Sequence, residues 1–124
     1  MKKVCNHLTQ SELLKLRNAC ILIDQAYYPC FLVGSCITSP SYRDVDVRCI
    51  IQDAEFDHMF PASTKRDLFD ARWSLLCNSI SDWLSSMTGL PVDFQFQKMS
   101  LANERFPGER QALTMHTSHG DARI

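Results

Sequence analysis

The sequence predicts a two-layer α/β (α+β) domain in which helices pack against a small mixed β-sheet, in the order α-β-β-α-β-α. Three observations support this fold class. Two long stretches have helical apolar spacing, three short runs are apolar or alternate with period two, and Gly, Pro and Ser residues separate them. The 124 residues, 45% of them hydrophobic, suffice for one compact domain. We expect this domain to span residues 1–115, with 116–124 as a flexible C-terminal tail.

The first helix is predicted over residues 10–28. Thr9 and Glu12 have the spacing of a capping box, and Pro29 prevents the helix from continuing. Apolar side chains then recur at spacings of three and four residues, at Leu13, Leu16, Cys20, Ile23 and Tyr27. This pattern indicates an amphipathic helix with one buried face.

The second long helix is predicted over residues 64–88, with Ser63 or Thr64 as its N-cap. Gly89 suits the position just beyond its C-terminus, and Pro91 prevents continuation. Its expected buried stripe consists of Phe69, Trp73, Leu76, Ile80, Trp83 or Leu84, and Met87.

Three strands are predicted, at 30–33, 44–51 and 92–97. The first is a continuous apolar run and therefore a buried strand. In the second, Val45, Val47, Cys49 and Ile51 alternate with Asp44, Asp46 and Arg48, and in the third Val92, Phe94 and Phe96 alternate with polar residues. Residues 52–63 are interpreted as a polar connection, and 100–115 as one or two short helices interrupted by Pro107 and Gly108.

Composition limits the classes of function. The 13 Lys and Arg residues against 14 Asp and Glu give a net charge of −1, which disfavours a protein that coats DNA. No apolar stretch reaches the roughly 20 residues that cross a bilayer, and the expected location is the cytoplasm, without membrane partners. The six cysteines include no C-x-x-C spacing, so we expect reduced and buried thiols rather than a zinc or redox centre.

Three acidic residues interrupt the predicted strands. Asp44 and Asp46 project from the same face of one strand, and Asp93 joins them if the second and third strands are neighbours. Three carboxylates would form a hard-oxygen site for Mg²⁺ or Mn²⁺. Because like charges repel, such a cluster requires a counter-ion or a raised pKa. The alternative interpretation is a solvated face of the sheet without a ligand.

A glycine and a hydroxyl residue, Gly34 and Ser35, directly follow the first predicted strand, where the backbone could approach a phosphate. The order of Gly34-Ser35, then Asp44-Val45-Asp46-Val47, then Asp93 resembles the nucleotidyltransferase superfamily that includes DNA polymerase beta, and its minimal members in particular. The segment from Cys36 to Arg43 is short for that family and lacks the Arg and Gly common there. Arg43 is the nearest substitute for the missing cation.

The resemblance implies Mg²⁺- or Mn²⁺-dependent transfer of a nucleoside monophosphate from an NTP to a hydroxyl acceptor, with release of pyrophosphate. Asp44, Asp46 and Asp93 would hold the metal ions, and Asp93 would also help to deprotonate the acceptor. Gly34, Ser35, Arg43 and Arg48 would contact the nucleotide. The acceptor (a protein, an RNA or a small molecule) stays open, as do a partner protein and a homo-oligomer.

Two further alternatives remain at this stage. The chain could be a non-catalytic module of the same fold that binds a partner, in the manner of an antitoxin or a regulator. Separately, the polar segment 103–108 could be a simple connector, or Glu104, Arg105 and Arg110 could line the cleft.

Overall fold

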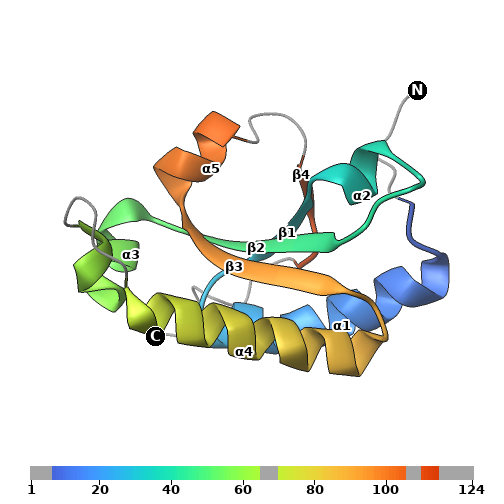
Figure 1. Ribbon diagram of the computed structural model, residues 1–124, viewed down its shortest axis with the longest axis horizontal. Helices are drawn as coiled ribbons and strands as arrows, with labels where there is room; N and C mark the ends of the chain where they lie inside the picture. Colours follow the sequence, from blue (N-terminus) through green and yellow to red (C-terminus); the bar gives the residue numbers. More distant parts are fainter. Residues whose placement is uncertain (1–6, 65–69, 106–109, 115–124) are drawn as a thin grey trace.

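The computed structural model describes residues 7–64, 70–105 and 110–114. They form a mixed four-stranded sheet in the order β3-β2-β1-β4, accompanied by helices (Figure 1). The elements, in chain order, are α1 (Gln10–Ala26), β1 (Cys30–Val33), α2 (Ser35–Thr38), β2 (Val45–Ile51), α3 (Asp53–Met59), the 3₁₀ turn η1 (Pro61–Thr64), α4 (Ala71–Thr88), β3 (Val92–Lys98), α5 (Met99–Arg105) and β4 (Arg110–Ala112). Strands β2 and β3 are parallel, whereas β1 is antiparallel to both β2 and β4.

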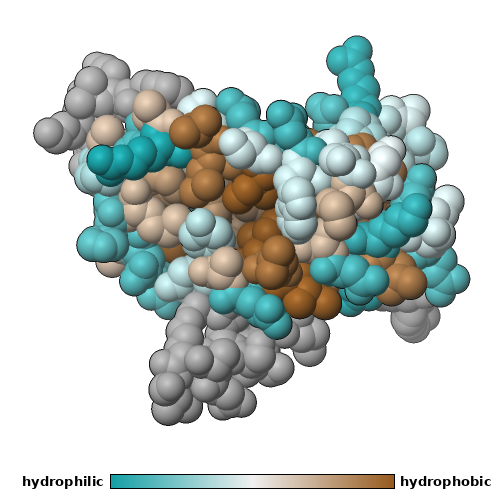
Figure 2. Space-filling view, turned by 90° about the horizontal axis from the view of Figure 1, so that it is seen from below, coloured by the Kyte–Doolittle hydropathy of each residue, from teal (hydrophilic) through white to brown (hydrophobic). Residues whose placement is uncertain are grey.

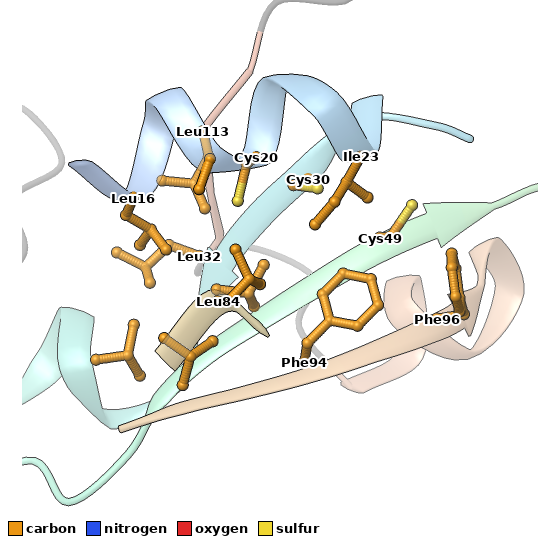
Figure 3. Packing of buried hydrophobic residues seen from close by; sticks show 14 of the residues in the cluster. Leu16, Cys20, Ile23, Cys30, Leu32, Cys49, Leu84, Phe94, Phe96 and Leu113 are labelled. Carbon is orange, nitrogen blue, oxygen red and sulfur yellow. The ribbon is translucent and has the colours of Figure 1, made fainter. Parts of the chain in front are cut away.

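The long helices α1 and α4 lie together against one face of the sheet, and the shorter α2 and α5 lie on the opposite side (Figure 1). The core fills the space between the long helices and the sheet. Leu16, Cys20 and Ile23 of α1 point toward the sheet residues Leu32, Phe94 and Phe96 (Figure 3). As the alternation predicts, Val45, Val47, Cys49 and Ile51 of β2 are all fully buried. The expected mixed sheet packed by helices is confirmed.

Capping explains where the helices begin. At α1 the predicted capping box is confirmed: the Glu12 amide donates to Thr9 Oγ1 at 3.1 Å, and the Thr9 amide donates to Glu12 Oε1 at 2.9 Å. The predicted start of the second long helix is wrong. Helix α4 begins at Ala71, because the carboxylate of Asp70 accepts the first free amides of the helix, from Arg72 at 3.0 Å and Trp73 at 3.1 Å.

Residues 61–64, including Ser63 and Thr64, instead form the 3₁₀ turn, and the expected helical residues 65–69 lie outside the described ranges. The C-terminal prediction is confirmed, since Gly89 ends α4 with a φ of 77°.

Two segments contain structure that the sequence interpretation missed. The expected polar connection 52–63 contains α3, whose Phe56 is buried and stacks edge-on against buried Phe60, with ring centroids 5.1 Å apart. Apolar residues four positions apart fall on one helical face, and the acidic residues of the first turn favour the helix N-terminus. Residues 100–115 contain β4 as well as part of α5, and β4 pairs with β1 through Phe31 and Ala112. The expected tail, 116–124, lies outside the described ranges.

Helix α4 closes the outer edge of β3. The Ser81 hydroxyl accepts from the Phe94 amide at 2.8 Å and contacts its carbonyl oxygen at 3.2 Å, and Ser85 makes the equivalent pair with Val92. The backbone groups of Phe96 face the same open edge of the strand. Its amide donates to Cys77 Sγ, and its carbonyl accepts from Trp73 Nε1 at 3.0 Å. These four side chains recur every fourth residue and so share one face of α4. They satisfy backbone groups that would otherwise invite another strand.

The outer face of the two long helices has an apolar patch between hydrophilic residues. Viewed from below, hydrophobic side chains form a continuous band across the molecule (Figure 2). Leu14 and Leu22 of α1 and Met87 of α4 are each more than half exposed. None of the helices in the described ranges combines the length and the apolar character that a membrane crossing needs.

The described cysteines are reduced and buried, as expected: Cys20, Cys30, Cys36, Cys49 and Cys77. Hydrogen bonding to Cys20 and Cys49, together with burial, raises the pKa of the Cys30 thiol well above its usual value. Burial also raises the pKa of Cys77 to about 11. Thiols of this kind stay protonated at neutral pH and are poor nucleophiles.

Candidate functional site

Asp46 and Asp93 lie side by side on the face of the sheet opposite the core. They are paired residues of the parallel strands β2 and β3, and each is flanked along its strand by buried residues of the core face. Paired positions on neighbouring strands are about 4.8 Å apart. Asp44 lies one residue before β2, is exposed and has the same parity as Asp46. The expected neighbourhood of Asp46 and Asp93 is therefore confirmed.

The same row continues across the whole sheet. Val33 of β1 pairs with Asp46, and Arg110 of β4 pairs with Val33. Because paired residues project from the same face, a guanidinium at one end of the row shares its face with two carboxylates at the other end. Arg110 lies over the Phe31 ring, 5.4 Å from its centroid, and donates to Asn103 Oδ1 at 2.9 Å. Arg110 therefore lies on the same face as the acidic pair, and its place in a cleft stays a prediction.

Gly34 approaches the carboxylate of Asp46 more closely than any other residue type could. Its φ is 82°, in the left-handed region that favours glycine. A Cβ at this position would collide with Asp46 Oδ2 and would lie 3.2 Å from Asp46 Cγ. The backbone at Gly34 therefore packs directly against the Asp46 carboxylate. Helix α2 starts at the following residue, Ser35.

Arg48 is the counter-ion of the acidic pair. It lies two residues after Asp46 on the same face, and only 8% of its surface is exposed. Its Nη1 donates to the Val47 carbonyl at 3.0 Å and to the Asp93 carbonyl at 2.9 Å, and its Nη2 lies 3.7 Å from Asp93 Oδ2. Arg48 is thus held against the protein rather than extended toward solvent, while Arg43 is exposed.

The electrostatics of Asp46 reflect this environment. Burial raises the pKa of the Asp46 carboxyl above its usual value; Arg48 opposes the shift, and the charges of Asp93 and Asp44 add to it. Of the two expected outcomes for clustered carboxylates, a counter-ion and a raised pKa, the site therefore has both.

The described residues include no set of three His, Cys, Asp or Glu side chains arranged to hold a metal ion. Asp46 and Asp93 alone provide two neighbouring carboxylates. Mg²⁺ is commonly bound through one or two carboxylates, with water and substrate phosphates completing the octahedron. The pair fits that mode of binding, and the participation of Asp44 stays a prediction.

Two further acidic residues belong to the helices α3 and α5. Asp53, at the start of α3, accepts a hydrogen bond from the Ser100 amide at 3.1 Å and so joins α3 to α5. Hydrogen bonds from the Ser100 hydroxyl and from its backbone amide lower the pKa of the Asp53 carboxyl. Glu104 is exposed on α5.

The sequence left open whether Arg110 lines the cleft, and it did not reveal the buried environment of Gln97 at the end of β3. Both depend on lateral strand pairing, and the only local signal was the polar alternation at Gln95 and Gln97. Comparisons of the chain with protein-family models, with curated proteins and with solved structures found no significant match.

Proposed function

We propose that the protein is a Mg²⁺- or Mn²⁺-dependent nucleotidyltransferase of the minimal type, which transfers a nucleoside monophosphate from an NTP to a hydroxyl acceptor. The observation that carries the proposal is the row formed by Asp93, Asp46, Val33 and Arg110, with Gly34 packed against Asp46. It combines a carboxylate pair for a cation, a close approach of backbone and an arginine on one face. This is what binding of a metal–nucleotide complex requires.

In the proposed reaction, the acceptor oxygen attacks the α-phosphorus and forms a new P–O bond. The bond from this phosphorus to the oxygen bridging it to the β-phosphate breaks, and pyrophosphate leaves. Asp93, with nearly half of its side chain exposed, accepts the proton of the acceptor hydroxyl. A divalent cation held by Asp46 and Asp93 would neutralise charge on the phosphates.

Arg48 and Arg110 have different tasks in this proposal. Arg48 neutralises the acidic pair and fixes Asp93 through its backbone carbonyl and its carboxylate. Arg110 offers a cation on the same face, over Phe31 of β1, and the β- and γ-phosphates would extend toward this strand. This compensates for the arginine that the short segment after Ser35 lacks. Ser35 and Arg43 retain the phosphate-side roles that the resemblance implies.

Label transfer provides the test. The protein is incubated with each α-³²P-labelled NTP, Mg²⁺ and a cell lysate, and labelled acceptors are then identified. Asp93→Asn should abolish transfer, and both Asp93→Asn and Asp46→Asn should weaken Mg²⁺-dependent NTP binding, because each removes one of the two carboxylates that would hold the cation. Asp82→Asn, an exposed aspartate on α4, is the matched control and should behave as wild type. Transfer that persists in Asp93→Asn would refute the assigned role.

A second candidate is the non-catalytic binding module. Two observations favour it: Arg48 already pairs with Asp93, and an apolar band covers the outer face of α1 and α4. The two candidates differ in a simple measurement. A binding module should show no metal-dependent NTP binding, and its partner binding should be insensitive to Asp46→Asn but sensitive to Leu22→Asp on the apolar face.

A further inference from the structure

A cavity of about 490 Å³ lies beside the C-terminal half of β3, on the outer side of this edge strand. Its volume is in the range of small-molecule sites. The walls come from α3, α4, β3 and α5, and they include Phe56, Trp73, Phe96, Gln95, Gln97 and Ser100. Because Phe56 and Phe96 are buried in the core, the aromatic surface of this wall comes from the partly exposed Trp73, and Gln95 and Gln97 add two amide side chains.

Gln97 is the unusual member of this wall. It is 95% buried, since only 5% of its surface is exposed, and its Oε1 has no hydrogen-bond donor among the described residues. A buried carbonyl oxygen without a donor is unfavourable, and a ligand N–H could supply the missing hydrogen bond. The neighbouring Lys98 does not supply this donor, because its ammonium pairs with Asp57 at 2.9 Å.

The aromatic part of the wall is fixed before any ligand arrives. Trp73 Nε1 is held by the Phe96 carbonyl at 3.0 Å. An aromatic ligand can therefore stack in the cavity without an ordering cost for this indole. The aromatic residues favour a flat π-system, and the amide favours one with a donor and an acceptor at adjacent positions.

The cavity is also positioned along the proposed path of the nucleotide. Gln95 lies two residues beyond Asp93 on the same face, roughly 7 Å away at about 3.3 Å per residue. Gly34 and Arg110, the proposed phosphate side, lie on the other side of Asp46, toward β1 and β4. A nucleotide with its phosphates at Asp46 would thus direct its nucleoside toward the β3 edge.

We infer that this cavity binds the base of the nucleotide substrate and that the base is adenine, read by the amide of Gln97. A glutamine amide pairs with the N6 donor and adjacent ring-nitrogen acceptor of adenine. Among the described lining residues there is no carboxylate to accept the paired N–H donors of guanine. This inference rests on the proposed function for the position of the phosphates.

The test measures the affinity of the full chain, with Mg²⁺, for ATP, GTP, CTP, UTP, inorganic tripolyphosphate and adenosine. Wild type should bind ATP at least tenfold more tightly than tripolyphosphate and than the other three NTPs. Gln97→Met, nearly isosteric, should reduce ATP affinity at least fivefold and leave tripolyphosphate affinity unchanged. Gln52→Met, at an exposed glutamine, is the control and should change neither.

A second variant guards against a folding defect at the buried Gln97. Leu101, exposed on α5 and part of the cavity wall, is changed to Trp to obstruct the cavity from outside. Leu101→Trp should also lower the affinity for ATP but not for tripolyphosphate.

The outcomes separate the two proposals. Equal affinities for ATP and tripolyphosphate, a preference for another base, or full ATP affinity in both variants would overturn the adenine site. Absence of tripolyphosphate binding would count against the proposed function alone if adenosine still binds and loses affinity in Gln97→Met. Absence of binding by ATP, tripolyphosphate and adenosine together would overturn both proposals.

Discussion

Gly34→Ala tests the contact between the strand-end glycine and the carboxylate of Asp46. The substitution has two separable costs. An alanine in the left-handed region, at the observed φ of 82°, costs about 1–2 kcal/mol. The added Cβ also collides with Asp46 Oδ2, and overpacking of this kind costs about 1–3 kcal/mol. The total loss of unfolding free energy should therefore be about 2–5 kcal/mol.

Gly89 is the matched control for the first cost. Its φ of 77° is nearly the same, but no atom lies within 4 Å of an added Cβ. Gly89→Ala should therefore lose only about 1–2 kcal/mol. Asp46→Ala supplies the control for the second cost, because it removes the carboxylate and leaves only a Cβ at 3.4 Å, an ordinary contact distance.

The assay is urea unfolding of wild type, the single variants and the Gly34→Ala/Asp46→Ala pair. In the Asp46→Ala background, Gly34→Ala should cost no more than Gly89→Ala does, so that the double-mutant cycle gives a coupling of about 1–3 kcal/mol. Thermal melting should follow the same order, at roughly 4 °C per kcal/mol for a domain of this size. If Gly34→Ala loses no more stability than Gly89→Ala, and loses the same amount with and without Asp46→Ala, Gly34 does not shape the Asp46 site.

Three further predictions concern charge, backbone pairing and thiols. Burial raises the pKa of the Asp46 carboxyl in the folded state, so wild type loses stability as the pH rises from the unfolded pKa of about 4 through the folded pKa. In urea unfolding at pH 7, Asp46→Asn should therefore be more stable than wild type. Below pH ~4 the substitution should bring no such gain. Ser81→Ala leaves a buried backbone amide and carbonyl of β3 without partners and should cost about 1–3 kcal/mol, whereas Ser86→Ala, exposed on the same helix, should cost less than about 0.5 kcal/mol in the same assay. A Cys5→Ser variant retains the five buried cysteines, including Cys77 with its pKa of about 11. It should react with a thiol reagent at pH 7.5 only after denaturant is added. Rapid labelling of the native protein would contradict the burial of these thiols.

Local signals in the sequence were sufficient where one segment determines its own structure. The Thr9 and Glu12 capping box lies within four residues, and its hydrogen bonds form as predicted. The alternation in β2 needs no partner strand, since period two alone separates Val47 from Asp46. The start of α4 was less determined, because several residues before it can cap a helix and the choice of Asp70 depends on its bond to the Ala62 amide.

The features that escaped prediction are those fixed by pairing across the sheet. Strand β4 has three residues and no period of its own, and it is defined by its bonds to β1. Arg48 was expected to contact a nucleotide, but its partner depends on β3 being the parallel neighbour of β2. The pairing of β1 with β2 and with β4 places Arg110 on the face of the acids. Sequence spacing along one strand contains no information about these lateral neighbours.

Strand pairing also explains why the candidate site would be well ordered without a ligand. The residues of the row lie on neighbouring strands, whose register is fixed by backbone hydrogen bonds and by a buried opposite face. Arg48 binds the Asp93 backbone carbonyl at 2.9 Å and lies 3.7 Å from its carboxylate, so that a positive charge stays beside the acid when no cation is bound. Trp73, which lines the cavity at the far end, belongs to the set of α4 side chains that closes the edge of β3. The contacts that stabilise the sheet are therefore the same contacts that position the proposed metal, phosphate and base sites, which is the arrangement that favours tight binding on a small scaffold.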